Sequence, residues 1–134
     1  MAQVVHICNR CKREGIALVS EGISSIKGYV WGMSFSCAYC GSRVEAQGGR
    51  PAPPDVRDAL ISQDGKWALR VTTAGAPRMK AVRALRSALS LSIEDAAKLK
   101  ASMPGRVAEG TRGEMEYLEW VLSQEEIGAS VEQS

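Results

Sequence analysis

Hydrophobic and polar residues follow two different periods in the second half of the chain. Residues 66–72 alternate between apolar and polar or small side chains, which predicts a half-buried strand. Its buried face carries Trp67, Leu69 and Val71. From residue 78 to residue 89 the apolar positions recur every three or four residues, as on one face of an amphipathic helix. The buried stripe predicted for this helix is Ala81, Val82, Leu85, Ala88 and Leu89.

A turn is predicted before this helix and a second helix after it. Residues 74–76 contain glycine between two alanines and predict the turn. Ser92 and Asp95 form a weak capping box for the second helix, which ends at residues 104–105, a Pro-Gly pair. The positions predicted to face inward are Ile93, Ala96, Leu99 and Met103.

A third helix and two short strands complete the second half. Thr111 and Glu114 form a full capping box, and the helix runs to about residue 126. Its predicted buried side is Met115, Leu118, Val121 and Leu122. Residues 106–108 and 129–132 are predicted to be short strands. The resulting order, β-α-α-β-α-β, predicts an α+β domain with helices packed on a small sheet.

The first half of the chain has a different, β-rich pattern. Residues 16–19 and 29–35 are predicted strands, and Gly22 is predicted to mark a turn between them. Residues 48–54 contain three prolines and no periodic apolar positions, which is typical of an extended connector. A short helix is predicted at residues 55–63. The predicted domains are a module at 1–47, a linker at 48–64 and a second domain at 65–134.

All four cysteines lie in the first module, as two Cys-x-x-Cys pairs. Cys8 and Cys11 form the first pair, and Cys37 and Cys40 form the second. Two such pairs, separated by enough chain to fold back as a hairpin, are typical of a tetrahedral Zn²⁺ site. Four thiolates leave no open position for water, so the predicted zinc is structural and the module is a zinc ribbon. Disulfides are the alternative, and His6 is either an outer-shell neighbour of the metal or a packing residue.

Basic and aromatic residues surround the predicted metal site. Four of the seven aromatic residues lie there: Tyr29, Trp31, Phe35 and Tyr39. They either cover the metal in a module with little core or stack on the bases of a nucleic acid. In the second case the phosphate-binding residues would be Arg10, Lys12, Arg13 and Arg43. The two interpretations stay open.

Composition and charge narrow the class of protein. The chain has 134 residues, of which 45% are hydrophobic and 24% charged, which excludes wholesale disorder. There is no apolar run of about 18 residues and no signal-peptide pattern, so we expect a soluble, cytoplasmic protein. The net charge of +2 conceals a basic segment, residues 70–100 with +5, and an acidic one, residues 101–134 with −5.

The second half resembles the C-terminal domain of the bacterial ribosomal large-subunit stalk protein. The resemblance lies in residues 74–86, a turn followed by a basic helix, in residues 91–97, and in Pro104. The resemblance is ungapped from Gly75 to Gly110. It continues to Glu132 with a shift of about one residue in the alignment, so it covers roughly half of the chain. It implies a non-catalytic domain whose first two helices recruit GTP-hydrolysing translation factors. The positions that match the factor-binding helix of the family are Arg78, Met79, Val82, Arg83 and Arg86.

Helical geometry and the departures from the family both bear on that surface. Met79, Arg83 and Arg86 fall within about 60° of one another around the helix, beside its buried stripe. Residues 90–92, Ser-Leu-Ser, replace the Gly-x-Gly loop of the family, and Glu94 stands where the family has a basic residue, as does Ala97. The zinc module stands in place of the family's dimerisation segment.

These observations predict a non-catalytic, zinc-binding interaction protein. A single histidine, no glycine-rich phosphate loop and no nucleophile–base pair argue against an enzyme. The expected partner is a protein with an acidic surface, such as a translation GTPase or a ribosome-associated factor, and no membrane or small-molecule substrate is expected. One alternative is a zinc-ribbon regulator that binds nucleic acid. Another is a dedicated neutraliser of one specific protein.

Overall fold

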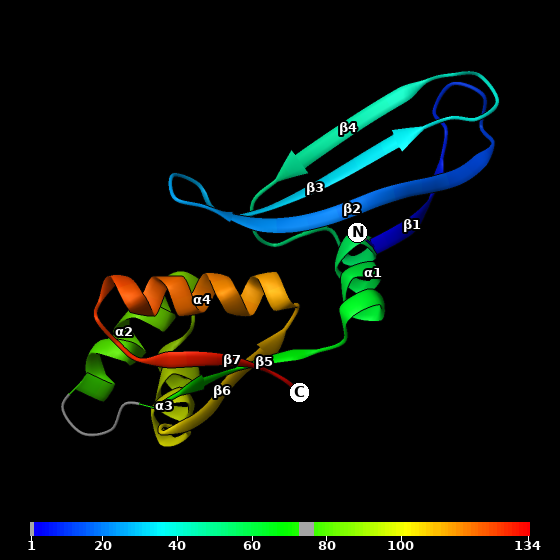
Figure 1. Ribbon diagram of the computed structural model, residues 1–134. Helices are drawn as coiled ribbons and strands as arrows, with labels where there is room; N and C mark the ends of the chain where they lie inside the picture. Colours follow the sequence, from blue (N-terminus) through cyan, green and yellow to red (C-terminus); the bar gives the residue numbers. More distant parts are fainter. Residues whose placement is uncertain (1, 73–76) are drawn as a thin grey trace. The chain divides into compact units, whose positions relative to one another are not determined.

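The protein is a mixed α+β chain made of two compact units. A computed structural model describes residues 2–72 and 77–134 (Figure 1). The units are Met1–Gly65 and Lys66–Ser134, and each has its own antiparallel sheet. The described residues form four helices in total. The turn predicted at residues 74–76 lies outside the described residues.

The sheet of the first unit is a four-stranded meander. Each strand pairs with the next one in an antiparallel ladder, so the strand order is the order in the chain. The strands are β1 (Ala2–Ile7), β2 (Glu14–Ser24), β3 (Gly28–Ser36) and β4 (Arg43–Gly48). In such a meander the β1–β2 and β3–β4 connections lie at one end of the sheet and the β2–β3 connection at the other, as Figure 1 shows.

The turn between β2 and β3 lies later than the sequence pattern predicts. The prediction of a turn at Gly22 is wrong, because Gly22 is part of β2 and is paired with Val30. The chain reverses after Ser24, whose hydroxyl accepts hydrogen bonds from the backbone N–H groups of Ile26 and Lys27 at 3.2 and 3.1 Å. A serine side chain that satisfies two turn amides therefore sets the reversal, and the glycine upstream of it remains in the strand.

The two faces of this sheet differ in burial. One face buries Ala17, Val19 and Phe35, which are at most 2% exposed. The opposite face leaves four apolar side chains between 40% and 59% exposed: Val5, Ile7, Ile16 and Leu18. Strand alternation places these two sets on opposite faces, so the apolar residues of β1 and β2 serve the core on one side only.

The helix after the sheet belongs to the first unit. This helix, α1 (Pro54–Asp64), contacts β1 and β2 and buries Val56 and Leu60. It begins with a proline at its first position, where the missing N–H is not needed, and Gly65 follows its last turn. The predicted helix at 55–63 is thus present, and residues 54–64 pack as part of the first unit.

The second unit has the order β-α-α-β-α-β that the periodicity predicts. Its sheet has the order β6-β5-β7, with β5 in the centre and antiparallel to both neighbours. Helix α4 packs across all three strands, and α2 packs against α3 and α4. The elements are β5 (Trp67–Val71), α2 (Pro77–Leu89), α3 (Ile93–Ala101), β6 (Gly105–Gly110), α4 (Arg112–Gln124) and β7 (Ala129–Gln133).

Most residues predicted to face inward lie in one hydrophobic core. Its buried members include Leu69, Val71, Ala81, Val82, Leu85, Ala96, Leu99, Met103, Met115, Leu118 and Leu122. Ile93 is the exception, since it is 74% exposed, and the prediction that it faces inward is wrong. It is the first residue of α3, and the helical period cannot show where the partner surface of a helix ends. Val121 is only half-buried.

Both predicted helix caps are confirmed. Ser92 accepts a hydrogen bond from the backbone N–H of Asp95 at 3.1 Å at the start of α3. At the start of α4, Thr111 accepts from the N–H of Glu114 at 3.1 Å, and the Glu114 carboxylate accepts from the N–H of Thr111 at 2.8 Å. The reciprocal pair satisfies two N–H groups that the helix itself leaves without partners.

Glu132 links two arginines on neighbouring strands of the second sheet. Its carboxylate lies 2.8 Å from Nε of Arg70 and 3.2 Å from Nε of Arg106, and these arginines are paired across β5 and β6. The hydrogen bond from Arg70 and the nearby Arg106 lower the pKa of Glu132 below its ordinary value of 4.5. The carboxylate therefore offsets the repulsion between two like charges that face each other.

We predict a pH-dependent effect of Glu132→Gln on stability. The pKa of Glu132 is lower in the folded protein than in the unfolded chain. Its contribution to the free energy of unfolding is therefore complete above pH 4.5, and it is lost as the pH falls through the pKa of the folded state. The variant should unfold at a lower temperature than the parent at neutral pH, and the difference should shrink below pH 4.5. Glu126→Gln, at an exposed position after α4, is the control. Equal effects of the two substitutions at every pH would contradict the prediction.

Candidate metal centre

Two turns at one end of the first sheet present the four cysteines. The turn between β1 and β2 carries Cys8 and Cys11, and the turn between β3 and β4 carries Cys37 and Cys40. Because β1–β2 and β3–β4 turn at the same end of the meander, the two cysteine pairs come close to each other. The meander thus brings together residues that are 26 and 32 positions apart.

The two turns have the same backbone hydrogen bonds. In the first, the N–H of Cys8 donates to the carbonyl of Arg13 at 2.9 Å, and the N–H of Lys12 donates to the carbonyl of Cys8 at 2.9 Å. In the second, the N–H of Cys37 donates to the carbonyl of Ser42 at 2.8 Å, and that of Gly41 donates to the carbonyl of Cys37 at 3.0 Å. One local backbone conformation therefore presents both pairs of cysteines.

The residue after each pair has a positive φ. This angle is 64° at Lys12 and 75° at Gly41. A left-handed residue after the second cysteine folds the chain back toward the next strand. Glycine suits this conformation, whereas lysine adopts it only at a steric penalty, which the first turn tolerates.

The sulfur atoms are arranged for a metal ion. Sγ of Cys8 lies 3.6 Å from Sγ of Cys40, and Sγ of Cys11 lies 3.5 Å from Sγ of Cys37. All four sulfurs lie within 4.8 Å of one another, and all four cysteines are free. A disulfide needs about 2.05 Å between sulfurs, whereas a tetrahedral site with Zn–S bonds of about 2.3 Å has edges of about 3.8 Å. These four residues could therefore hold a metal ion.

The first cysteine of each pair lies deeper than the second. Cys8 and Cys37 are 2% and 7% exposed, whereas Cys11 and Cys40 are half-buried. The buried pair packs with Ala17 and Phe35 in a small cluster. Partly buried residues complete this small core: Val4, Cys11, Met33, Cys40 and Val44. In a core of this size the metal would be the principal crosslink.

The pKa values of two of the four cysteines are lowered, mainly by hydrogen bonds from backbone amides. The N–H of Cys11, together with that of Arg10, lowers the pKa of Cys8 to about 6. The N–H of Cys40, together with that of Tyr39, lowers the pKa of Cys37. The more deeply placed cysteine of each pair is thus the one that its turn prepares to bind a cation.

Crowding of the sulfurs has the opposite effect at Cys11. The N–H of Arg13 favours its thiolate, but burial and the neighbouring sulfurs of Cys37 and Cys8 outweigh that hydrogen bond and raise the pKa of Cys11 to about 11. Several thiolates at these distances repel one another, so full ionisation of the site needs a cation among them.

His6 packs against the cluster through its ring. The centroids of His6 and Phe35 lie 4.5 Å apart with the rings tilted by 56°. Within the described part of the chain, its Nε2 is buried without a hydrogen-bond partner. Of the two roles that the sequence allows for His6, the contacts show packing.

The predicted phosphate-binding residues lie around the same two turns. Arg10, Lys12 and Arg13 are exposed in the first turn, and Arg43 is exposed at the start of β4. The guanidinium carbon of Arg13 lies 4.5 Å from the centre of the Tyr39 ring. The fold therefore gathers these residues at the end of the sheet that carries the cysteines.

The four aromatic residues of this unit are not equivalent. Tyr39 is 64% exposed, whereas Tyr29 and Phe35 are each 2% exposed and Trp31 is half-buried. The hydroxyl of Tyr29 donates to the Glu21 carboxylate at 2.7 Å. Three of the four rings thus contribute to packing, and Tyr39 is the one on the surface.

The residues matched to the factor-binding helix of the stalk family divide into two groups. Met79 is 42% exposed, and Arg83 and Arg86 are also exposed on α2. Val82 is 7% exposed and belongs to the core, and Arg78 is half-buried. The structure brings Met79, Arg83 and Arg86 together on one accessible face and directs Val82 away from it.

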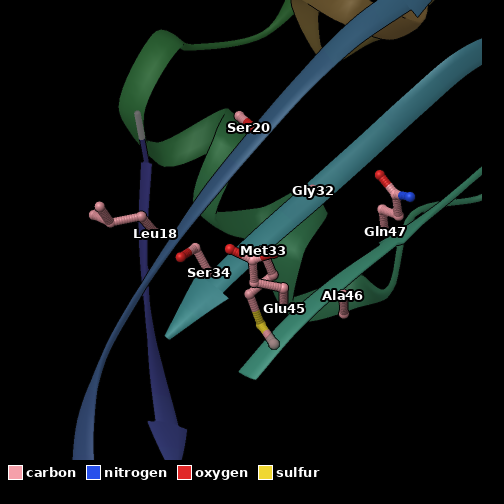
Figure 2. A pocket seen from close by; sticks show the side chains of 8 residues that line it. All are labelled: Leu18, Ser20, Gly32, Met33, Ser34, Glu45, Ala46 and Gln47. Atoms are coloured by element: carbon pink, nitrogen blue, oxygen red, sulfur yellow. The ribbon is translucent and has the colours of Figure 1, made fainter. Parts of the chain in front are cut away.

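A shallow pocket on the first sheet has no signal in the amino-acid sequence. Its volume is about 510 Å³, and Figure 2 shows that its lining side chains come from β2, β3 and β4. Gly32 has no side chain and Ser20 and Ser34 have short ones, which leaves the sheet hollow at this place. Among the described residues that line it, Glu45 is the one ionisable side chain, so these residues offer no acid–base pair.

Comparison with known proteins assigns no family. No family model matches the chain, and neither the curated proteins nor the solved structures contain a match. The resemblance of the second half to the ribosomal stalk domain therefore stays a prediction that rests on the residues quoted for it. None of the helices in the described parts of the chain has the length and apolar character needed to cross a membrane.

Proposed function

We propose that this chain is a non-catalytic interaction protein in which a structural Zn²⁺ stabilises the first unit and the second unit docks an acidic protein surface. The observation that carries the docking proposal is the exposed face of α2. There an apolar side chain, Met79, lies beside two arginines on a helix whose other face is buried.

The ligand set supports zinc as the metal. Four cysteine sulfurs at tetrahedral spacing suit Zn²⁺, which prefers thiolates and has no geometric demand beyond the tetrahedron. Cys8, Cys11, Cys37 and Cys40 would all be ligands, so the site has no position for substrate or a reactive water. When bound, the metal would supply structural crosslinking and charge compensation to the two turns.

The docking face combines an anchor with two charges. Met79 has a flexible, polarisable side chain that adapts to an apolar pocket on a partner. No carboxylate in the described residues pairs with Arg83 or Arg86, and Nε of Arg86 donates to the carbonyl of Leu91 at 3.3 Å. Two available cations beside an exposed methionine favour an acidic partner with an apolar pocket.

The stalk resemblance adds the class of the partner. It points to a translation GTPase or another ribosome-associated factor, because Met79, Arg83 and Arg86 match positions of the family's factor-binding helix. Glu94 and Ala97 are exposed on α3 in place of basic residues, which reduces the positive charge available next to α2. We therefore expect a narrower set of partners than that of the stalk protein.

We predict that reversing both charges weakens partner binding. The double variant Arg83→Glu/Arg86→Glu should reduce the affinity for ribosomes or for a purified translation GTPase by about tenfold or more, since attraction becomes repulsion at two positions. Affinity is measured by co-sedimentation with ribosomes and by titration calorimetry with purified factors.

Lys27→Glu/Lys66→Glu is the matched control for this experiment. Both lysines are exposed and lie outside α2. Two Lys→Glu replacements change the net charge of the protein by the same amount as the two Arg→Glu replacements. Its affinity should stay close to that of the parent. An equal loss in both double variants would show a diffuse charge effect, and unchanged binding in the α2 variant would contradict the surface assignment.

A further inference from the structure

The end of the first sheet that carries the cysteines also presents a basic, aromatic surface. We call it the knuckle surface and define it by five exposed residues: Arg10, Lys12, Arg13, Tyr39 and Arg43. It is formed by the two cysteine turns and the first residue of β4, so the fold that assembles the metal site also assembles this surface.

The basic residues of the knuckle surface carry more positive charge than is needed to neutralise a metal ion bound by four thiolates. Residues 8–13 and 37–43 contain four basic residues and no acidic one. Four thiolates and one divalent cation would leave two negative charges, so part of the basic charge serves as compensation. The remainder is positive, and the basic side chains are exposed to solvent. A surface with this excess positive charge attracts a polyanion.

Tyr39 distinguishes this surface from an ordinary basic patch. It is 64% exposed, although a phenol ring of this size is normally a core or interface residue. The Arg13 guanidinium lies over its ring at 4.5 Å, which orients the ring and leaves most of it accessible. An exposed, oriented aromatic ring next to several cations is the arrangement that binds an unpaired base and its phosphates.

We propose that the knuckle surface binds single-stranded nucleic acid, with a base stacked on Tyr39 and the phosphates next to Arg10, Lys12 and Arg43. A single strand fits better than a duplex, because only unpaired bases offer a face for stacking on Tyr39. The surface is independent of the docking face on α2, so either function can fail without the other.

The test uses the full, zinc-loaded chain and a labelled oligouridine of about 12 nucleotides, a length within the range of small single-strand sites. Fluorescence anisotropy at several salt concentrations gives the affinity and its salt dependence. Tyr39→Ala should weaken binding by about tenfold, whereas Tyr39→Phe should retain it, because phenylalanine preserves stacking. Arg10→Ala/Lys12→Ala should lower the salt slope by about 0.7 for each phosphate that the protein then leaves unneutralised.

Lys27→Ala is the matched control within the same unit. Lys27 is exposed in the β2–β3 turn, at the end of the sheet opposite the cysteines, and its replacement should leave the affinity nearly unchanged. Zinc content and circular dichroism of each variant show that the unit remains folded.

Three results would overturn the proposal. The first is no binding of the oligouridine at low salt. The second is unchanged binding by Tyr39→Ala while Lys27→Ala weakens binding, which would mean nonspecific charge attraction without stacking. The third is a matched duplex bound as tightly as the single strand, which would exclude stacking on Tyr39.

Discussion

Replacing Cys37 by serine is expected to abolish stoichiometric zinc binding and to unfold the first unit. The free energy of metal binding in a small four-ligand site, about 10–16 kcal/mol, is at the same time folding free energy. Cys37 is 7% exposed and belongs to the cluster of Cys8, Ala17 and Phe35, so its replacement removes a ligand and a core residue together.

Zinc content by atomic absorption and amide spectra by NMR measure the result. The amide signals of the first unit should collapse toward those of an unfolded chain, while signals from the core of the second unit, such as Leu122, stay dispersed. Ser36→Ala is the matched control, because it changes the exposed neighbour of Cys37 without touching a ligand. A Cys37→Ser protein that keeps full zinc and the spectrum of the parent would contradict a structural metal centre.

Replacing Leu85 by alanine is expected to destabilise the second unit by about 2–5 kcal/mol. Leu85 is 0% exposed and lies in the core built by β5, α2, α3 and α4. Its truncation reduces apolar burial and leaves a cavity that rigid neighbours fill only in part. A unit of this size has a total stability of about 3–10 kcal/mol, so a large share of it would disappear.

Urea unfolding followed through NMR signals of the second unit measures this change. Met79→Ala is the control on the same helix, because Met79 is 42% exposed and alanine is a good helix former. It should change stability by no more than about 0.5 kcal/mol. Equal destabilisation by the two variants would show that the buried face of α2 is assigned incorrectly.

Local signals in the sequence are sufficient to predict the helices and strands of the second unit. Alternation identifies β5, the helical period identifies α2, and the Thr111–Glu114 capping box marks the start of α4. These features depend on side chains within a few residues of one another, so they can be recognised without the fold. The same holds for the two cysteine pairs, whose spacing matches a metal site before any geometry is known.

Other features depend on contacts between distant segments. The periodicity places Ile93 with the buried residues, but the core does not extend to the first residue of α3. Gly22 is typical of a turn, but pairing with Val30 keeps it in a strand. The pattern assigns α1 to a linker, whereas the helix packs on β1. Each difference arises because a local pattern does not specify which distant surface will cover it.

The candidate metal centre shows the same difference between local and long-range information. Four cysteines in two Cys-x-x-Cys pairs specify the chemistry of the site, because thiolate ligands and their spacing are properties of the chain. That Cys8 meets Cys40 and Cys11 meets Cys37 follows from the strand order of the meander, which is a long-range property.

The aromatic residues of the first unit show most directly what only the tertiary structure decides. Tyr29 and Phe35 are buried and Tyr39 is exposed, although the sequence leaves the same two roles, packing or base stacking, open for all three. Residue types and spacing thus determine which groups take part in the site. Packing between distant strands decides which of them reach the surface, because burial depends on neighbours that the local sequence does not contain.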